Sequence, residues 1–362
     1  MLKVIRYHHI TEVLMEPEVI IEEWSPLGNI QALVEKTERT YYFYLWINPE
    51  SKNPQIRSCW ICNRIKGVRD IKDALAIEGQ EPLMPTEFVD HDPNGIDIDE
   101  SGLSILWSEE GDAAAVLSHD KLLAVIPSFS GMNGFHGYST YARGMGSFAW
   151  EMKQAYANLD AQFRKGQRFW SYFDTEYWPE VQDSHMKTLQ AFFGEHEKYY
   201  AIDRNEFPPK ALVTGRKQGI LFAFTIAVSM IPMPGVEMSY DEDYLKYRRM
   251  ELGFACHPEH NDILNRVYSM MSFLAAMPWL ELTFLGHGHT IPFDGIPGYD
   301  YLLFLNTNEI KDIDAPVYKD FMGERINLLW IRPITKEEYA FELENGVAAY
   351  LEDMDLTTVH IF

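Results

Sequence analysis

Cysteine is scarce in this chain of 362 residues, which contains only Cys59, Cys62 and Cys256. Three thiols cannot form the disulfide framework of a small secreted domain, so the sequence favours a reducing compartment. The longest apolar run, Gly219 to Met233, is shorter than the ~20 residues of a membrane-spanning helix. The opening MLKVIRYHHI lacks the continuous apolar segment of a secretory signal. We therefore expect a cytoplasmic protein that has no membrane partner.

Basic side chains are the minority charge. The chain has 31 Lys and Arg against 54 Asp and Glu, which gives a formal net charge of -23. A surface of this sign repels the phosphate backbone of nucleic acids, so we expect no direct binding to DNA or RNA. The same surface attracts basic proteins, and it also serves solubility. Because 46% of the residues are apolar, the chain can bury a large core and is long enough for two domains.

Residues 1–146 are predicted to form a β-rich domain of unknown role. Arg39 to Asn48 is dense in aromatic residues and precedes a proline, which is typical of a strand, and Gln55 to Ile65 fits its hairpin partner. Leu103 to Trp107 and Leu122 to Ile126 fit further short strands.

Residues 147–185 are predicted to form a helical connection that is broken near Gly166, because the spacing of the apolar residues lengthens there. Residues 186–362 form the second predicted domain. Its expected strands are Gly219 to Val228, Arg249 to Cys256, Leu280 to Leu285, Tyr299 to Leu305 and Ile326 to Ile331. Between them, Asn261 to Ala276 has helical apolar spacing, with Asn261 or Asp262 as its cap. The predicted fold is α+β with two lobes, and the C-terminal lobe has a mainly antiparallel or mixed sheet packed by helices.

Two details sharpen the expected second domain. Met250 to Cys256 alternates large apolar residues with others, which predicts a strand with one buried face. Thr335 followed three residues later by Glu338 is a capping box, so a helix is expected to begin there. Its apolar side is expected to include Phe341 and Leu343.

Two motifs in the first domain imitate metal sites. Cys59 and Cys62 have a CxxC spacing, but residues i and i+3 of a strand point to opposite faces, so one ion cannot reach both thiols. Asp90 to Ser101 resembles a calcium loop, but Ser101 stands where the bidentate Glu is required. A turn between strands explains the second motif equally well. We expect no cofactor at either motif.

The segment Met277 to Phe293 is the most distinctive of the chain. Its apolar half predicts a buried strand, after which Gly286 and Gly288 frame His287 and His289. Two imidazoles at this spacing are candidate metal ligands, and His257 is a third. The alternative is structural, with one imidazole bonding to the backbone at the end of a strand.

Five stretches in the same order resemble the suppressor-of-fused family. They are PMPG at residues 232–235, ELGFACHPE at 251–259, LGHGHTIPF at 285–293, YLLFLN at 301–306 and INLLWIRPITKEEYAFELENG at 326–346. The resemblance covers about residues 186–362. It implies a protein-binding module, not an enzyme, and bacterial relatives are regarded as immunity proteins that neutralise toxins. For this acidic chain the resemblance implies a protein partner, with a basic toxin as the candidate.

Two other hypotheses stay open. One is a metal-dependent hydrolase centred on His287 and His289, with a metal-bound water as nucleophile. The other places binding in a cleft between the lobes, formed by the glycine- and aromatic-rich loop Ser130 to Gly146 and the His287 turn, because aromatic side chains commonly anchor interfaces. The candidate binding residues are Phe135, His136, Tyr138, Trp279, His287 and His289. The partner's identity and the oligomeric state are left open.

Overall fold

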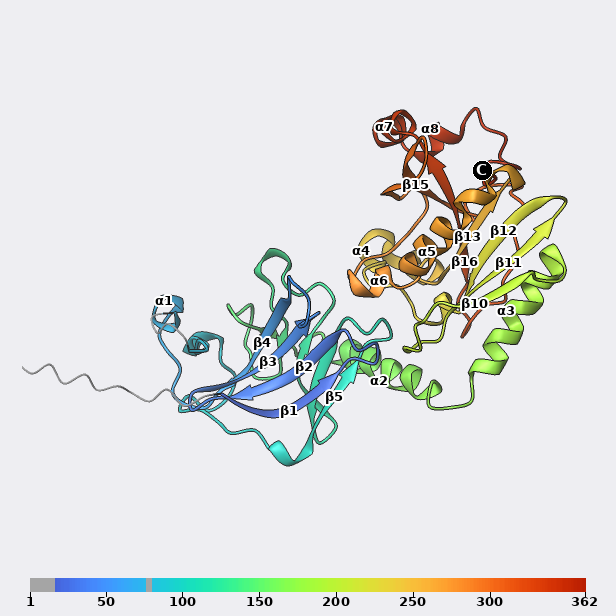
Figure 1. Ribbon diagram of the computed structural model, residues 1–362. Helices are drawn as coiled ribbons and strands as arrows, with labels where there is room; N and C mark the ends of the chain where they lie inside the picture. Colours follow the sequence, from blue (N-terminus) through green and yellow to red (C-terminus); the bar gives the residue numbers. More distant parts are fainter. Residues whose placement is uncertain (1–16, 76–79) are drawn as a thin grey trace, which may run out of the picture. The chain divides into compact units, whose positions relative to one another are not determined.

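The computed structural model describes residues 17–75 and 80–362, which divide into two compact units. The first unit holds residues 17–24, 30–75, 80–106 and 114–160, and the second holds residues 25–29, 107–113 and 161–362. Two short loops of the N-terminal half, residues 25–29 and 107–113, therefore belong to the second unit. The predicted α+β fold with a β-rich N-terminal part is confirmed (Figure 1).

Two sheets make up the described part of the first unit. One has the order β1-β2-β3-β4 and is antiparallel, with β1 Glu18–Trp24, β2 Ile30–Lys36, β3 Thr40–Ile47 and β4 Gln55–Asn63. The other has the order β5-β6-β7-β8-β9, with β5 Leu103–Trp107, β6 Ala114–Ser118, β7 Lys121–Ile126, β8 Tyr138–Ser139 and β9 Trp150–Glu151. The predicted hairpin and the two predicted short strands are confirmed. Short helical turns are α1 Ile71–Ala74, η1 Thr86–Phe88, η2 Glu100–Gly102 and η3 Met132–Gly134.

The first sheet buries one face. On β3, Tyr41, Phe43 and Leu45 are fully buried, whereas Tyr44 and Trp46 alternate with them on the other face and are partly exposed. Side chains of a strand point alternately to the two sides, so the buried set faces the second sheet, which β3 and β4 contact through β7.

The second unit is built on a seven-stranded sheet within residues 161–362, all of which the structure describes. Its order is β10-β11-β12-β13-β16-β15-β14, with β10 Lys198–Ala201, β11 Ala211–Lys217, β12 Ile220–Ile226, β13 Met250–Cys256, β14 Thr290–Ile296, β15 Tyr299–Asn306 and β16 Asn327–Ile334. Neighbouring strands are antiparallel except β13 and β16, which are parallel. The predicted mixed sheet is confirmed.

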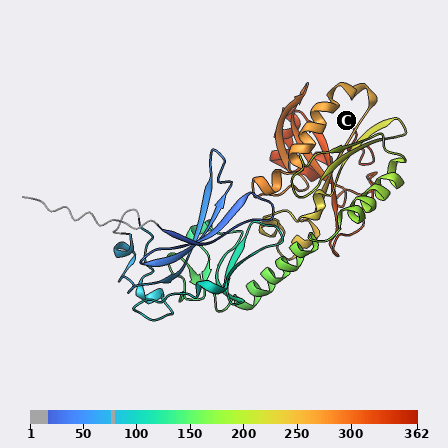
Figure 2. The same ribbon diagram turned by 60° about the horizontal axis from the view of Figure 1, so that its bottom comes forward.

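Helical segments cover both faces of this sheet. They are α2 Tyr156–Tyr172, α3 Trp178–Phe193, α4 Glu237–Tyr240, α5 Leu264–Leu274, α6 Met277–Leu280, α7 Lys336–Asn345 and α8 Val347–Leu351, with short turns η4 Val228–Met230, η5 Asp241–Lys246 and η6 Pro258–Ile263. Residues of α3 and α8 pack on one face, and residues of α5 and α6 pack on the other (Figures 1 and 2). No helix in the described residues is long and apolar enough to cross a membrane.

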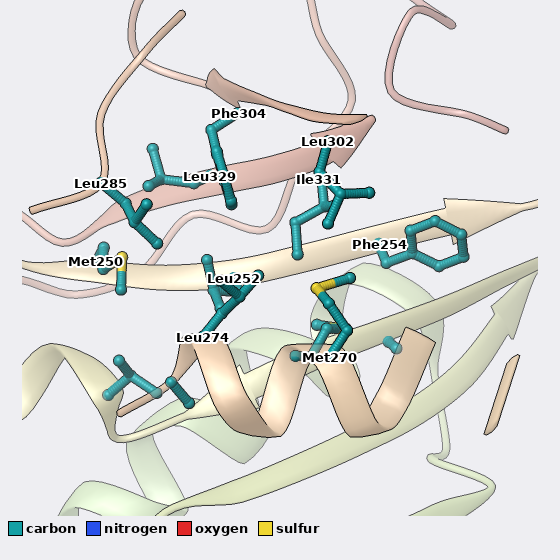
Figure 3. Close-up of a cluster of buried hydrophobic side chains, with 14 of the residues drawn as sticks. Met250, Leu252, Phe254, Met270, Leu274, Leu285, Leu302, Phe304, Leu329 and Ile331 are labelled. Atoms are coloured by element: carbon teal, nitrogen blue, oxygen red, sulfur yellow. The ribbon is translucent and has the colours of Figure 1, made fainter. Parts of the chain in front are cut away.

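The central strand β13 corrects one prediction. All seven of its residues are buried, so the expected single buried face is wrong. Met250, Leu252 and Phe254 join the core beneath α5, where Met270 and Leu274 point toward the sheet (Figure 3), while Ala255 joins the core of the opposite face. Helices on both faces remove the solvent side that strand alternation assumes.

The predicted strand Leu280 to Leu285 is also wrong. The helix α6 ends at Leu280, and Leu282 adopts a left-handed backbone with φ of 49°. The N–H of Thr283 donates to the carbonyl of Pro278 at 2.9 Å, which closes a turn. Pro278 lies in the first turn of α6, a position that proline favours, so it starts a helix where apolar composition alone predicted a strand.

Two helix predictions need revision, and one is confirmed. The helix α2 continues through Gly166, where a Cβ atom would lie 2.0 Å from the carbonyl oxygen of Trp107, so glycine permits close packing and does not break the helix. The helix α5 has no side-chain cap, and Ile263 precedes it. The predicted capping box of Thr335 and Glu338 is present at the start of α7.

Buried charges hold the loop 107–113 within the second unit. Arg248, which is 2% exposed, pairs with Glu109 at 2.8 Å, with Glu110 at 2.6 Å and with Glu324. The neighbouring Arg249 also binds Glu324, at 2.8 Å. An arginine offers five donors in one plane, so a single side chain can pair with several carboxylates at once.

Candidate functional site

The turn around His287 and His289 leads into β14 and is held by β15. The N–H of Gly288 donates to the carbonyl of Phe304, and the N–H of Phe304 donates to the carbonyl of His289, both at 2.9 Å. Gly288 has φ of 79°, and a Cβ atom there would lie 3.0 Å from Val347. The residue must therefore adopt a left-handed conformation beside α8, which glycine does at least cost.

His287 has a structural contact. Its Nδ1 accepts a hydrogen bond from the backbone N–H of Asn306 at 3.2 Å, at the end of β15. Burial lowers the pKa of His287, and Glu309 only partly offsets this. A neutral ring that accepts at Nδ1 carries its proton on Nε2. This backbone contact agrees with the structural alternative for one of the two imidazoles, although the strand it joins is β15 and not the predicted strand 280–285.

His289 lies against Phe284, with ring centroids 4.9 Å apart. Burial lowers the pKa of His289, and a hydrogen bond to the backbone of Phe284 partly offsets the effect. Its side chain is half-buried and borders open space on one side. His289 lines a groove.

That groove has a volume of about 540 Å³ and lies between the His289 turn and the end of α7. Its lining residues are Met277, Thr283, Phe284, Leu285, Gly288, His289, Thr290, Ile291, Glu342, Leu343 and Gly346. Leu343 is 69% exposed at the rim, and Glu342 is only 9% exposed. Burial raises the pKa of Glu342. The groove can take an apolar group together with a hydrogen-bond donor or a cation next to Glu342.

The candidate metal ligands do not form a cluster. Among residues 17–75 and 80–362, no group of three or more His, Cys, Asp or Glu side chains is placed to hold a metal ion. The exposed His257 precedes η6, and its backbone N–H donates to Phe362 at 2.8 Å.

The two metal-like motifs of the first unit have other contacts. Cys59 and Cys62 are buried free thiols, and burial raises the pKa of both. In the loop 90–101, the carboxylates have separate partners, as Asp90 pairs with Arg143, Asp97 pairs with Arg64 and Asp99 lies 2.8 Å from Nε2 of His119. These carboxylates serve the packing of the loop.

Trp279 is part of the core. It is 6% exposed, and its Nε1–H donates to the carbonyl of Pro232 at 3.0 Å. Lys210 lies over its ring, with Nζ 5.4 Å from the centroid. The side-chain amide of Asn29, in the loop 25–29, donates to the carbonyl of Trp279 at 2.8 Å. These contacts give Trp279 a structural role in the second unit.

The other three candidate residues belong to the first unit. Phe135 is 6% exposed and packs edge-on against Tyr138 and Trp150, with centroid distances of 5.0 and 4.7 Å. Nδ1 of His136 lies 3.2 Å from the carbonyl oxygen of Ser58. A binding surface shared with Trp279, His287 and His289 stays a prediction.

Sequence reasoning missed the α7 wall of the groove. It placed Phe341 and Leu343 on the apolar side of the helix, but they are 48% and 69% exposed, whereas Glu342 between them is buried. Residues two positions apart do not lie on one face of a helix. The spacing of Phe341 and Leu343 could therefore have shown that both do not face the core.

Residues 206–361 match the family model described as Suppressor of fused protein (SUFU). The C-terminal part of the chain therefore carries a suppressor-of-fused domain, which confirms the resemblance, and this is a protein-interaction domain family. The matched segment contains the groove and most of the seven-stranded sheet. No curated protein and no solved structure matches the chain in the other two comparisons.

Proposed function

We propose that the suppressor-of-fused domain makes this chain a non-catalytic binding protein of the cytoplasm, which neutralises a basic toxin by direct contact. The observation that carries the proposal is the family match over residues 206–361, because the family consists of protein-interaction domains. The first unit lies outside the match.

The groove beside His289 supports a protein partner. An apolar side chain of the partner can replace water against Phe284, Ile291 and Leu343, because burial of apolar surface drives association. A basic group next to it can pair with Glu342, for which the described residues show no ion pair. A cation there relieves the cost of burying that carboxylate.

The overall charge supports a basic partner. With a net charge of -23, the chain attracts cationic proteins over several ångströms and speeds their encounter. Many nucleases that act as toxins are basic, and an acidic inhibitor binds such proteins quickly. Salt screens this attraction, so the association rate is the quantity that reports it.

Binding to a basic toxin encoded next to this chain tests the proposal. We expect tight binding whose association rate falls at least about tenfold from low to high salt. Leu343→Arg is expected to weaken binding at least about tenfold, because it removes the apolar side chain from the groove rim and places a cation against the basic partner. Glu259→Gln, which removes an exposed carboxylate outside the groove, is the matched control. Equal effects of the two variants would remove the groove from the proposal.

Toxicity and metal content test the remaining parts. Co-expression of the chain is expected to rescue growth of cells that produce the toxin, and binding without rescue would contradict neutralisation. Protein purified without a histidine tag is expected to contain no stoichiometric metal. Zinc or iron that is bound at one equivalent and lost in His287→Ala, together with turnover of a substrate, would overturn the non-catalytic proposal in favour of a hydrolase.

A further inference from the structure

Four strands of the first unit place one residue each in a row across the outer face of their sheet. The strand register pairs Trp24 with Gln31, Gln31 with Trp46, and Trp46 with Ile56. Residues that lie directly opposite each other in antiparallel strands point to the same face. Since neighbouring strands are about 4.8 Å apart, the row extends over roughly 14 Å.

Three members of this row are large, apolar and exposed. Trp24 is 42% exposed, Trp46 is 36% exposed and Ile56 is 58% exposed. The same face is covered at its other end, where Leu33 and Tyr42 are 5% and 3% exposed. Several exposed apolar residues grouped at the open end of a sheet face are typical of a binding surface, whereas single exposed apolar residues are not.

A segment of the chain covers one end of this face and leaves the end with the tryptophans exposed. The hydroxyl of Tyr42 donates to the carbonyl of Pro82 at 2.8 Å, so the chain near residue 82 packs over that end. Tyr44 lies between the two ends and is partly buried, with its ring 5.9 Å from that of Tyr42. The tryptophan row therefore begins where this internal cover stops.

Carboxylates lie on the same face as the tryptophans. Glu22 is two residues from Trp24 on β1, and its Oε1 accepts a hydrogen bond from Nε2 of Gln31 at 2.6 Å. Glu35 lies opposite Tyr42. Burial and the nearby Glu81 raise the pKa of Glu35. Among residues 17–75 and 80–362, no ion pair joins Glu22 or Glu35 to a cation, so this face is both aromatic and acidic.

We propose that this face docks an extended basic segment of another protein, whose Arg or Lys side chains stack on Trp24 and Trp46 and pair with Glu22 and Glu35. Tryptophan is the strongest partner for a cation above an aromatic ring, and the planar guanidinium of arginine stacks on it better than an ammonium group. A second copy of this chain would bring like charges together, and a nucleic acid would meet the same repulsion. The proposal does not rest on the function of the suppressor-of-fused domain, because the face lies outside residues 206–361.

Fluorescence anisotropy with a labelled octapeptide of alternating arginine and threonine tests the proposal on the full chain. We expect the arginine peptide to bind several times more tightly than the lysine analogue, and the glutamate analogue not to bind. Trp46→Ala and Trp24→Ala are each expected to weaken binding about tenfold, whereas Trp46→Phe retains an aromatic face and weakens it only about threefold. Glu22→Gln combined with Glu35→Gln is expected to weaken binding and to flatten its salt dependence.

Two substitutions elsewhere serve as matched controls. Phe273→Ala removes a 57% exposed aromatic residue of α5, and Glu259→Gln removes an exposed carboxylate, so both are expected to leave peptide binding unchanged. Peptide binding that is absent, or that the controls weaken as much as the tryptophan variants do, would overturn the proposal. So would self-association abolished by Ile56→Lys, or equal affinity for a single-stranded RNA. The expected result also requires that Trp24→Ala and Trp46→Ala keep the wild-type circular dichroism spectrum.

Discussion

The four-stranded sheet of the first unit and the seven-stranded sheet of the second differ in what covers their faces. The first sheet buries one face, and Trp46 and Ile56 remain exposed on the other. The second has helices on both faces, so even Arg249 and Glu251 beside the core of β13 are fully buried. A sheet covered on one side can present side chains to partners, whereas a sheet covered on both sides must satisfy every polar group internally.

The buried charges of the second unit show how this is done. Glu251 accepts hydrogen bonds from the hydroxyls of Thr225 and Ser229, both at 2.7 Å, and lies 3.2 Å from Nε2 of His185. In the first unit, comparable ion pairs such as Arg143 with Asp90 lie at the surface, where water screens them. The contrast predicts that removing a charged side chain lowers the free energy of unfolding much more in the second unit than in the first.

The largest difference in stability between the two units is expected when an arginine is replaced. Arg248→Ala leaves Glu109, Glu110 and Glu324 without their shared cation, so we expect a loss of about 3–5 kcal/mol in the free energy of unfolding. Arg143→Ala breaks an exposed pair and is expected to cost less than about 1 kcal/mol. Urea denaturation measures both. Similar losses for the two variants would contradict the contrast between the units.

Replacing a buried histidine is expected to have a smaller effect on stability, and this effect depends on pH. Burial opposes the charge of His185, but its hydrogen bond to Glu251 outweighs burial and raises its pKa above 6.5. Burial likewise opposes the charge of Glu251, yet its hydrogen bonds from His185 and Ser229 prevail and lower its pKa below 4.5. At a pH at which both groups are charged, His185→Gln is expected to lower the free energy of unfolding by about 1.5–3 kcal/mol.

The pH dependence follows from these two directions. The contribution of charged His185 is complete below pH 6.5 and is lost as the pH rises through its raised pKa. The contribution of charged Glu251 is complete above pH 4.5 and is lost as the pH falls through its lowered pKa. The cost of His185→Gln should therefore be greatest between pH 4.5 and 6.5 and shrink at higher pH. Unfolding curves at several pH values measure it, with His119→Gln in the exposed pair with Asp99 as the control. A cost that is constant with pH would show that His185 is not charged.

The capping box of α7 is expected to have an intermediate effect. Thr335→Ala removes the side-chain hydrogen bond to the N–H of Glu338, which is worth about 1 kcal/mol in the free energy of unfolding. Thr188→Ala, in the interior of α3, is the control and is expected to change stability by a few tenths of a kcal/mol at most. Equal effects would mean that the cap adds nothing beyond helix propensity.

The smallest effect is expected on the open face of the first sheet. Ile56→Thr keeps a β-branched side chain at a position that is 58% exposed, so the free energy of unfolding should change by less than about 0.5 kcal/mol. Thermal unfolding measures the change. A loss above about 1 kcal/mol would indicate that this face is buried in solution, and the comparison between the two sheets would fail.

The sequence predicts most of the strands because their signals are local. Thr40 to Ile47 is rich in aromatic residues, and Thr335 with Glu338 forms a cap within four residues. The burial of β13 on both faces depends on α3 and α5, which lie far away in the chain, so local alternation could not predict it. The segment Leu280 to Leu285 failed as a strand because Pro278 starts a helix before it.

The candidate site was predicted only in part for the same reason. Glycine and histidine at residues 286–289 mark the turn, and His289 does line the groove. The opposite wall, Glu342 and Leu343, comes from a helix more than 50 residues later, and nothing in its local pattern links it to the turn. Only the folded arrangement of β14, β15 and α7 brings the two together.

The loop 107–113 has a consequence for synthesis. The ribosome finishes Glu109 and Glu110 well over a hundred residues before it adds Arg248, and Glu324 follows later still. During that interval the arginine that both carboxylates share does not yet exist, and of the two only Glu109 has another cation, Lys165, in the described part of the finished structure. A fragment that begins at residue 206 would never receive them, so Arg248 and Arg249 would compete for Glu324 alone. The segment that matches the family therefore takes two of the ion-pair partners of Arg248 from residues that are synthesised long before it.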